Sequence, residues 1–383
     1  MHDPRPLHRR DLLKAGIAAS CGAGWLASLP SAPRGGEVAA LRPPAFSVIP
    51  VVGDGHWVWT EPPEGETGYL EPRSYELTIG IEVEGAGPAE EIISTTTVPV
   101  DYPEQKIESS EIKTRGCQAY LRTIIEGAGQ LVLNAAEIAA GEVVSAMVRY
   151  RLTLLKQFHD FSAERFPAVQ KIPPDVRKRF LQDSPGIQAR SRQVRTLANE
   201  LTSGTPLHPW AKAKKFAEWV PLNITPQIGN YTSVTAALDD RRGDCEEMAG
   251  VFIALCRAVG IPARLVWVPN HAWAEFFLHD HEGRGHWIPA HTACYSWFGY
   301  TGAHELVLQK GDRVMLPEKR KLVRLLPDWT RFVGHQPRVR YTAELTPLPS
   351  QPEGDAGPGA RRKDERGEWQ VVSHHPLDRY TRR

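Results

Sequence analysis

Hydrophobic and polar residues follow two different periods along the chain, and the change falls between residues 155 and 173. From Ser74 to about Leu155 the two kinds of residue alternate, as in the run Tyr-Glu-Leu-Thr-Ile at 75–79, and a period of two predicts half-buried strands. Three further strands are predicted, over residues 92–100, 118–125 and 143–155. We therefore predict a small β-sandwich domain over residues 74–155.

Two segments of this β domain depart from simple alternation. Residues 98–105 contain two prolines, which donate no backbone hydrogen bond, so an edge strand is predicted there. Residues 131–140 have the composition of a helix inside a β pattern, and the sequence leaves helix or strand open.

From residue 173 the apolar residues recur at helical spacing. Three helices are predicted, over residues 187–201, 209–220 and 244–259, and a loop is predicted over 221–239. Three short strands follow, at 264–268, 271–278 and 286–291, with a turn at 280–285. A hairpin near 307–314 and a strand at 339–345 come last. These elements predict an α+β fold with a second domain over residues 173–345.

The first forty residues have the pattern of an export signal. Residues 8–14 read His-Arg-Arg-Asp-Leu-Leu-Lys, a mildly apolar stretch runs over 15–29, and Val-Ala-Ala at 38–40 offers a cleavage site. We therefore expect residues 1–40 to be a twin-arginine-type signal peptide. The protein is then expected to be exported to a periplasm or to the extracellular space.

The composition of the remaining segments, the balance of charged residues and the cysteine count exclude several classes of protein. Residues 41–73 are expected to form a lead-in segment, and residues 346–383, rich in proline, glycine and charge, a disordered tail. No stable membrane span is expected after signal cleavage. With 46 basic and 45 acidic residues the chain lacks the basic excess that neutralises nucleic-acid phosphates. Five cysteines in 383 residues are too few for a disulfide scaffold.

One cysteine stands at the predicted start of a helix. Residues 242–247 read Arg-Gly-Asp-Cys-Glu-Glu, with Asp244 placed as N-cap and Glu247 three positions later, as in a capping box. The free N–H groups of a helix start favour the thiolate form of Cys245, and the thiolate is the nucleophilic form. Cys245 is therefore the candidate nucleophile.

A candidate base follows in a predicted strand. His271 opens the run His-Ala-Trp-Ala-Glu at 271–275, and an imidazole is the usual partner of a nucleophilic thiol. Cys256 lies on the apolar face of the predicted helix and is interpreted as a core residue. The sequence does not decide the disulfide state of Cys117, Cys256 or Cys294.

At this point the chain resembles the transglutaminase-like superfamily, a branch of the papain-like cysteine enzymes. The resemblance rests on three runs in order, Arg-Gly-Asp-Cys-Glu-Glu at 242–247, Leu-Cys-Arg-Ala-Val-Gly-Ile-Pro-Ala-Arg at 255–264 and His-Ala-Trp-Ala-Glu at 271–275. It implies a papain-like core of helices packed on an antiparallel sheet, preceded by a β domain as in exported bacterial members. It also implies that Cys245 forms a thioester, and that His271 activates the thiol and protonates the leaving group.

At the third catalytic position this chain differs from the family it resembles. Members usually carry Trp-x-x-x-Asp in the next strand, where this chain has Trp287 followed by His291. An orienting carboxylate fixes the tautomer of the base and stabilises its cation. A neutral His291 would accept a hydrogen bond from His271 but would stabilise the imidazolium less. Three outcomes stay open: slower chemistry, a substitute partner such as Glu275 or Asp280, or an inactive protein.

The resemblance implies a peptide or carboxamide substrate, and the acceptor decides the reaction. Water as acceptor gives a peptidase or amidase, which the bacterial members favour, and an amine gives protein cross-linking. Cell-wall peptide or exported protein is the expected substrate. The alternative is a catalytically inactive binding or scaffold module. Metal-dependent hydrolysis by His279, His281, His286 and His291 ranks last because these residues lack paired ligand spacing, so no metal or cofactor is predicted.

Overall fold

The computed structural model describes residues 67–124, 127–203, 208–229, 231–293 and 297–349, together with the short strands β18 (Arg362–Lys363) and β19 (Trp369–Gln370). Several predicted features lie outside the described residues: the signal peptide at 1–40, the lead-in up to residue 66, Cys294, and the tail beyond residue 349 apart from those two strands. In the described part of the chain, no helix has the length and apolar character needed to cross a membrane.

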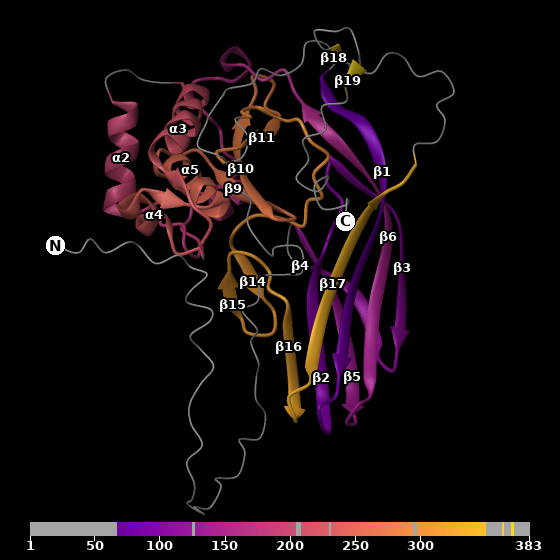
Figure 1. Ribbon diagram of the computed structural model, residues 1–383. Coiled ribbons are helices and arrows are strands. Elements are labelled where there is room, and N and C mark those ends of the chain that lie inside the picture. Colours follow the sequence, from indigo (N-terminus) through magenta and orange to yellow (C-terminus); the bar gives the residue numbers. More distant parts are fainter. Residues whose placement is uncertain are drawn as a thin grey trace, which may run out of the picture. The chain divides into compact units, whose positions relative to one another are not determined.

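Two antiparallel sheets form the N-terminal β region (Figure 1). In the first sheet β1 lies between β6 and β17, and β3 and β12 both pair with β6. Its strands are β1 (Gly68–Glu84), β3 (Gln105–Arg115), β6 (Val143–Phe158), β12 (Tyr300–Thr301) and β17 (Arg338–Pro347). β1 begins inside the expected lead-in segment, and β17, from near the end of the described chain, pairs along it.

The second sheet continues from the β region into the second half of the chain. Its order is β11-β10-β9-β13-β5-β2-β16, and β4 pairs with β5. The strands are β2 (Ala89–Val98), β4 (Gln118–Ile124), β5 (Ala128–Ile138), β9 (Ala263–Val268), β10 (His271–His279), β11 (Gly285–Ala290), β13 (Gln309–Lys310) and β16 (Trp329–Gly334). Gln309 makes the junction, because it pairs with Ala128 and with Trp267. Strands that the sequence placed in the second domain thus complete the sheets of the β region.

The inner faces of these two sheets share one apolar core, as the alternation predicts. Leu77 and Ile79 of β1 are buried and lie in the same cluster as Leu131 and Leu133 of β5. The segment 131–140, left open between helix and strand, is therefore β5 as far as Ile138, because its apolar residues alternate into this core.

The predicted edge strand at 98–105 is wrong. β2 ends at Val98, and the segment after it turns, with Tyr102 and Gln105 exchanging two backbone hydrogen bonds of 2.8 and 3.0 Å. The chain then enters β3, a strand of mostly exposed polar residues. Such a strand carries little apolar periodicity, which is why the sequence pattern did not reveal it.

Helix α5 (Cys245–Ala258) is the central helix of the second half. Helices α2, α3 and α4 pack on it, and it packs on β9 and β10. The other helices are η1 (Ala163–Arg165), α1 (Pro174–Phe180), α2 (Arg192–Thr202), α3 (Pro209–Asn223) and α4 (Val234–Asp240), and the remaining strands are β7 (Thr225–Pro226), β8 (Arg242–Gly243), β14 (Val314–Leu316) and β15 (Lys321–Val323). The predicted loop over 221–239 is wrong in part, because α3 continues into it and it contains β7 and most of α4.

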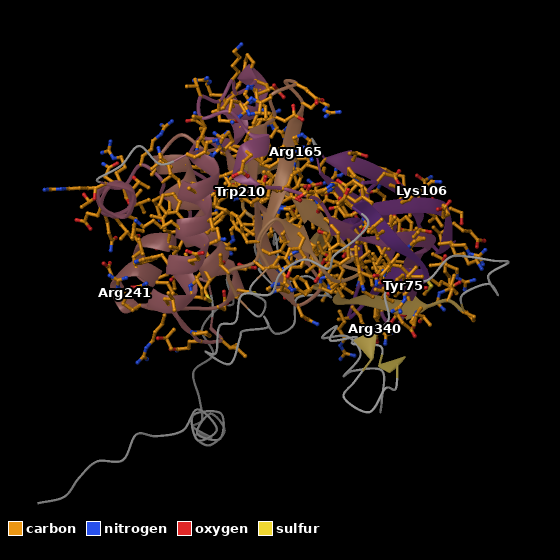
Figure 2. The ribbon with its side chains drawn as sticks, turned by 90° about the horizontal axis from the view of Figure 1, so that it is seen from above. Tyr75, Lys106, Arg165, Trp210, Arg241 and Arg340 are labelled. Atoms are coloured by element: carbon orange, nitrogen blue, oxygen red, sulfur yellow. The ribbon has the colours of Figure 1, made fainter. Side chains whose placement is uncertain are left out.

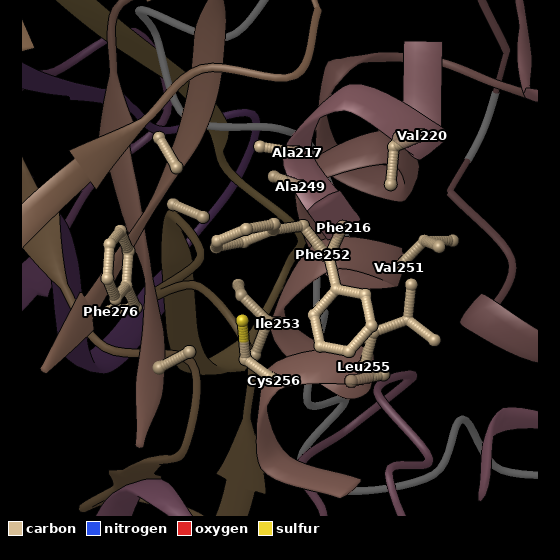
Figure 3. Packing of buried hydrophobic residues seen from close by; sticks show 14 of the residues in the cluster. Phe216, Ala217, Val220, Ala249, Val251, Phe252, Ile253, Leu255, Cys256 and Phe276 are labelled. Carbon is tan, nitrogen blue, oxygen red and sulfur yellow. The ribbon is translucent and has the colours of Figure 1, made fainter. Parts of the chain in front are cut away.

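The core around α5 is dense and apolar. Phe252 of α5 lies edge-on to Phe276 of β10, with ring centroids 6.1 Å apart, in a cluster that also holds Phe216 of α3 (Figure 3). Cys256 is fully buried in this cluster, which confirms its interpretation as a core residue. Trp210 of α3 lies among the packed side chains in Figure 2, and its ring lies 6.0 Å from that of Phe276. This packing fixes α5, and with it Cys245 at its first position.

Candidate active site

Cys245 is the first residue of α5, at the position that the sequence predicts. Asp244 is the N-cap, and its carboxylate accepts hydrogen bonds from the N–H groups of Glu246 at 2.9 Å and Glu247 at 3.3 Å. The Glu247 carboxylate accepts the N–H of Asp244 at 3.0 Å, so the expected capping box is confirmed. Cys245 is therefore held on a fixed helix start, with 1% of its surface exposed.

Glu247 also joins this helix start to the segment before α4. Its other carboxylate oxygen accepts hydrogen bonds from the N–H and the hydroxyl of Thr232, at 3.1 and 2.9 Å. Gly243 provides the space, because a Cβ on this glycine would lie 2.6 Å from the Cβ of Glu247. The glycine of the Arg-Gly-Asp-Cys run thus allows the glutamate to fold back over the cap.

Three carboxylates are concentrated around Cys245. Burial, followed by the negative charges of Glu246 and Glu247, raises the pKa of Asp244 to about 7. Negative charge beside a thiol opposes formation of the thiolate, whereas the N–H groups of a helix start favour it. A cation near these carboxylates therefore favours the thiolate.

Arg324, in the segment between β15 and β16, places a cation beside this helix start. Its guanidinium forms an ion pair with Glu246 at 2.6 Å and lies 3.4 Å from the centre of the Tyr231 ring. The Tyr231 hydroxyl donates a hydrogen bond to the carbonyl of Gly186 at 2.8 Å, which fixes the ring beneath the arginine. Sequence reasoning missed Arg324, because 78 residues separate it from Glu246 and no local pattern connects the two.

His271 and His291 are brought together by the β10–β11 hairpin. His271 is the first residue of β10, and His291 directly follows the last residue of β11. Their ring centroids lie 5.8 Å apart, with the ring planes inclined by 24°. Trp273, two residues after His271, stacks on the His291 ring at 4.7 Å. The hairpin therefore assembles two of the three predicted site residues, and α5, which begins at Cys245, packs against β10.

His291 is a buried histidine without charge at neutral pH. None of its surface is exposed, and burial lowers its pKa well below the usual 6.5, with a further lowering by the neighbouring His271. Its Nε2 lies 3.5 Å from the hydroxyl of Thr301, and its backbone N–H donates to the carbonyl of Trp297 at 2.8 Å. This position therefore holds a fixed ring where the family usually has a negative charge.

The two carboxylates considered as substitutes are held elsewhere. Glu275 is fully buried and forms ion pairs with Arg264 and Lys310, each at 2.6 Å. Burial raises its pKa, but the two cations outweigh burial and the net pKa is lowered. Glu275 stands four residues from His271 along β10, about 13 Å in an extended strand. Asp280 lies at the other end of β10 from His271, where it accepts hydrogen bonds from its own turn and contacts His286 of β11, so neither carboxylate adjoins His271.

The histidines considered as metal ligands have separate partners. His279 and His281 each bond to a backbone group of the segment before α1, and His286 Nε2 lies 2.8 Å from the Asp280 carboxylate. His291 stacks with His271 and Trp273 instead. Across the described ranges, no group of three or more His, Cys, Asp or Glu side chains is arranged to hold a metal ion.

Comparison with known proteins points to the same part of the chain. Residues 195–292 match the Transglutaminase-like superfamily. Peptide-N(4)-(N-acetyl-beta-glucosaminyl)asparagine amidase of Yarrowia lipolytica is 28% identical over 96 residues, which are 25% of this chain and 24% of the amidase. This chain thus spans about a quarter of the length of the curated relative that it matches. The crystal structure described as "a putative cysteine protease" from Cytophaga hutchinsonii shares the fold, with a TM-score of 0.51 and 16% identity over 74% of this chain and 94% of that one.

These findings define the class of protein. It is an α+β protein with an N-terminal antiparallel β region and a transglutaminase-like core, as the sequence predicts. The matched residues contain all three predicted site residues, Cys245 on α5 and the two histidines of the β10–β11 hairpin.

Proposed function

We propose that this protein is a cysteine-dependent enzyme that cleaves peptide or carboxamide bonds through a thioester, with water as its usual acceptor. The observation that carries the proposal is Cys245 on a complete capping box at the start of a buried helix, inside the residues that match the superfamily. The Yarrowia lipolytica relative is an amidase by name, which supports a carboxamide or peptide substrate. The likeness to the Cytophaga hutchinsonii structure supports the fold alone.

In the proposed reaction the Cys245 thiolate attacks the substrate carbonyl carbon. The N–H groups of Glu246 and Glu247 donate to Asp244, so the Cys245 N–H is the proposed donor from this helix start to the oxyanion that forms. The tetrahedral intermediate then breaks its carbon–nitrogen bond, and the imidazolium of His271 gives its proton to the leaving amine. A thioester on Cys245 and a free amine result.

The second half of the reaction frees the enzyme. Water attacks the thioester carbonyl while His271 accepts a proton from the water. The carbon–sulfur bond breaks, the acid is released and Cys245 returns to its starting state. An amine in place of water would give a new amide by the same first half-reaction.

His291 is the proposed orienting group for His271. A neutral ring that is buried and stacked holds its neighbour in place, but it adds no negative charge to stabilise the imidazolium. We therefore expect slower turnover than an orienting carboxylate would give. The same feature favours the second candidate function, a catalytically inactive binding or scaffold module.

We further infer that the protein is exported and meets cell-wall peptide or exported protein as substrate. The twin-arginine pattern at 8–14 supports export. Twin-arginine export carries folded proteins, so Cys245 would already be buried in its site before it reached an oxidising compartment.

Amine release from peptides and carboxamides tests the proposal. Cell-wall stem peptides and glutamine peptides are incubated with the wild-type protein and with Cys245→Ala, His271→Ala and Cys256→Ala, the last as a matched control on the same helix. We expect release by the wild type and Cys256→Ala, a thioester adduct on Cys245 in mass spectra, and loss in the other two. Release that survives Cys245→Ala would indicate metal-dependent chemistry, and no release at all would favour the binding module.

A further inference from the structure

We propose that Arg324 is a positioning residue that holds Cys245 in its thiolate form, by neutralising Glu246 next to it on α5. The inference rests on the proposed role of Cys245 as nucleophile. Arg324 acts through Glu246, and nothing in the capping box or in the matched sequence runs assigns this task to it.

Three acidic side chains lie at the helix start, and Arg324 is the cation that forms an ion pair with one of them. The charged groups of the helix start are the N-cap Asp244 with Glu246 and Glu247 of α5, and Arg324 and Tyr231 come from neighbouring segments. His271 and His291 come from the hairpin, and the Arg257–Asp312 pair lies towards the other end of α5.

The charged groups of α4 and β8 next to the helix start are Asp239, Asp240, Arg241 and Arg242. Three of these have contacts elsewhere: Asp239 accepts from Gln193, Arg241 lies over the Trp219 ring, and the exposed Arg242 reaches Gln227 at 3.4 Å. Arg257 and Asp312 pair with each other at 2.8 Å and add no net charge. Burial raises the pKa of Tyr231 and keeps it neutral. Above about pH 7, where Asp244 is ionised as well, Arg324 therefore offsets part of the negative charge of the three carboxylates.

Of these three carboxylates, only Glu246 pairs with a cation in the described part of the chain. Asp244 and Glu247 accept hydrogen bonds from the cap and from Thr232. The Arg324–Glu246 pair is mostly buried, with 19% and 13% of the two side chains exposed, so solvent screens it weakly. Stacking on Tyr231 fixes the guanidinium in one place. The pair therefore acts as a fixed local charge balance one residue from the thiol.

Loss of Arg324 would leave Glu246 as an uncompensated negative charge beside Cys245. A neighbouring like charge raises the pKa of an acid, and a rise of about one unit is about a tenfold loss of thiolate where the group is mostly protonated. Because the effect comes from Glu246, removal of both charges should cancel it.

The pH dependence of iodoacetamide labelling at each cysteine, mapped by mass spectrometry, tests this inference. Iodoacetamide is uncharged, so its local concentration does not depend on the charge of the site, and the midpoint of the profile does not depend on how exposed the thiol is. We expect Arg324→Met to raise the midpoint at Cys245 by about one unit. We expect Arg324→Met with Glu246→Gln to return it to within about 0.3 units of the wild type, and Arg324→Lys, which keeps the charge, to stay close to it.

A matched control separates charge from structure. Arg122 forms an ion pair with Glu318 at a similar burial, with 24% and 11% of the side chains exposed, and Glu318 lies in the turn between β14 and β15, just before Arg324 in the chain. Arg122→Met should leave the Cys245 midpoint unchanged. An unchanged midpoint in Arg324→Met, or a shift that Glu246→Gln fails to reverse, would overturn the inference.

The same labelling profiles distinguish failure of this inference from failure of the proposed function. The proposed function fails if wild-type Cys245 labels with the ordinary thiol midpoint of about 8.5 and His271→Ala does not change it. The Arg324 variants are compared by the labelling midpoint of one thiol, Cys245. This comparison gives a result even if the protein turns over no substrate.

Discussion

His291 is the residue at which the charge balance of the site can be changed most directly. Its ring centroid lies 5.8 Å from that of His271, where an aspartate would place a negative charge beside the imidazole. We expect His291→Asp to raise the pKa of the His271 imidazolium by about one unit, because an opposite charge at this range favours the charged form. The alkaline limb of amine release, which needs the imidazolium as general acid, should then move up by the same amount.

The control for this substitution is His291→Asn, which has nearly the shape of aspartate but no charge. Both variants lose the stacking on Trp273 and leave a small cavity, so both should unfold more readily by about 2–4 kcal/mol. Only the aspartate should move the alkaline limb. Equal profiles for the two variants would show that the charge at this position does not reach His271.

The capping box of α5 makes stability depend on pH. The pKa of Asp244 is raised to about 7 in the folded protein, first by burial, whereas an unfolded aspartate titrates near 3.9. Between these values the folded protein retains a proton that the unfolded chain has lost. The wild type should therefore lose stability as pH rises from about 4 to about 7, by an amount on the order of a few kcal/mol at most.

Asp244→Asn tests this directly, since asparagine also caps helices but does not titrate. The free energy of unfolding in urea, measured at pH 5 and pH 8, should favour the asparagine variant more at pH 8 than at pH 5. Asp101→Asn, at an exposed position in the turn after β2, is the control and should show no such change between the two pH values. A difference that stays constant from pH 5 to pH 8 would contradict a raised pKa at Asp244.

Elements with one strong local pattern could be predicted from the sequence, and those that depend on distant partners could not. The capping box and the apolar spacing define α5 within the chain itself, and the alternation after residue 271 defines β10. β3 carries almost no apolar signal, and α4 lies in a segment read as a loop. The site follows the same division, because Cys245 and His271 stand in local motifs whereas Arg324 reaches Glu246 only through the fold.

At the scale of the whole molecule, a buried group of charges joins the β region to the strands of the site. Lys310 of β13 forms ion pairs with Glu275 of β10 and with Glu104 of the turn before β3. Both glutamates and the lysine are at least nine-tenths buried. Removal of one member from such a group leaves an uncompensated charge inside the protein, which costs about 3–5 kcal/mol. The β region and the transglutaminase-like core are therefore expected to depend on each other for stability.

Lys310→Met tests this dependence, because methionine keeps most of the side-chain volume and leaves Glu104 without its cation. We expect the free energy of unfolding in urea to fall by about 3–5 kcal/mol, in one transition seen by both tryptophan fluorescence and far-ultraviolet circular dichroism. A single transition is expected because the second sheet is continuous through Gln309, so neither half can keep its strands paired alone. Lys113→Met, in an exposed pair with 61% of each side chain in solvent, should change stability by no more than about 0.5 kcal/mol. Two separate transitions in Lys310→Met would instead mean that the β region and the core fold independently, and that the buried charges only connect two units that are each stable alone.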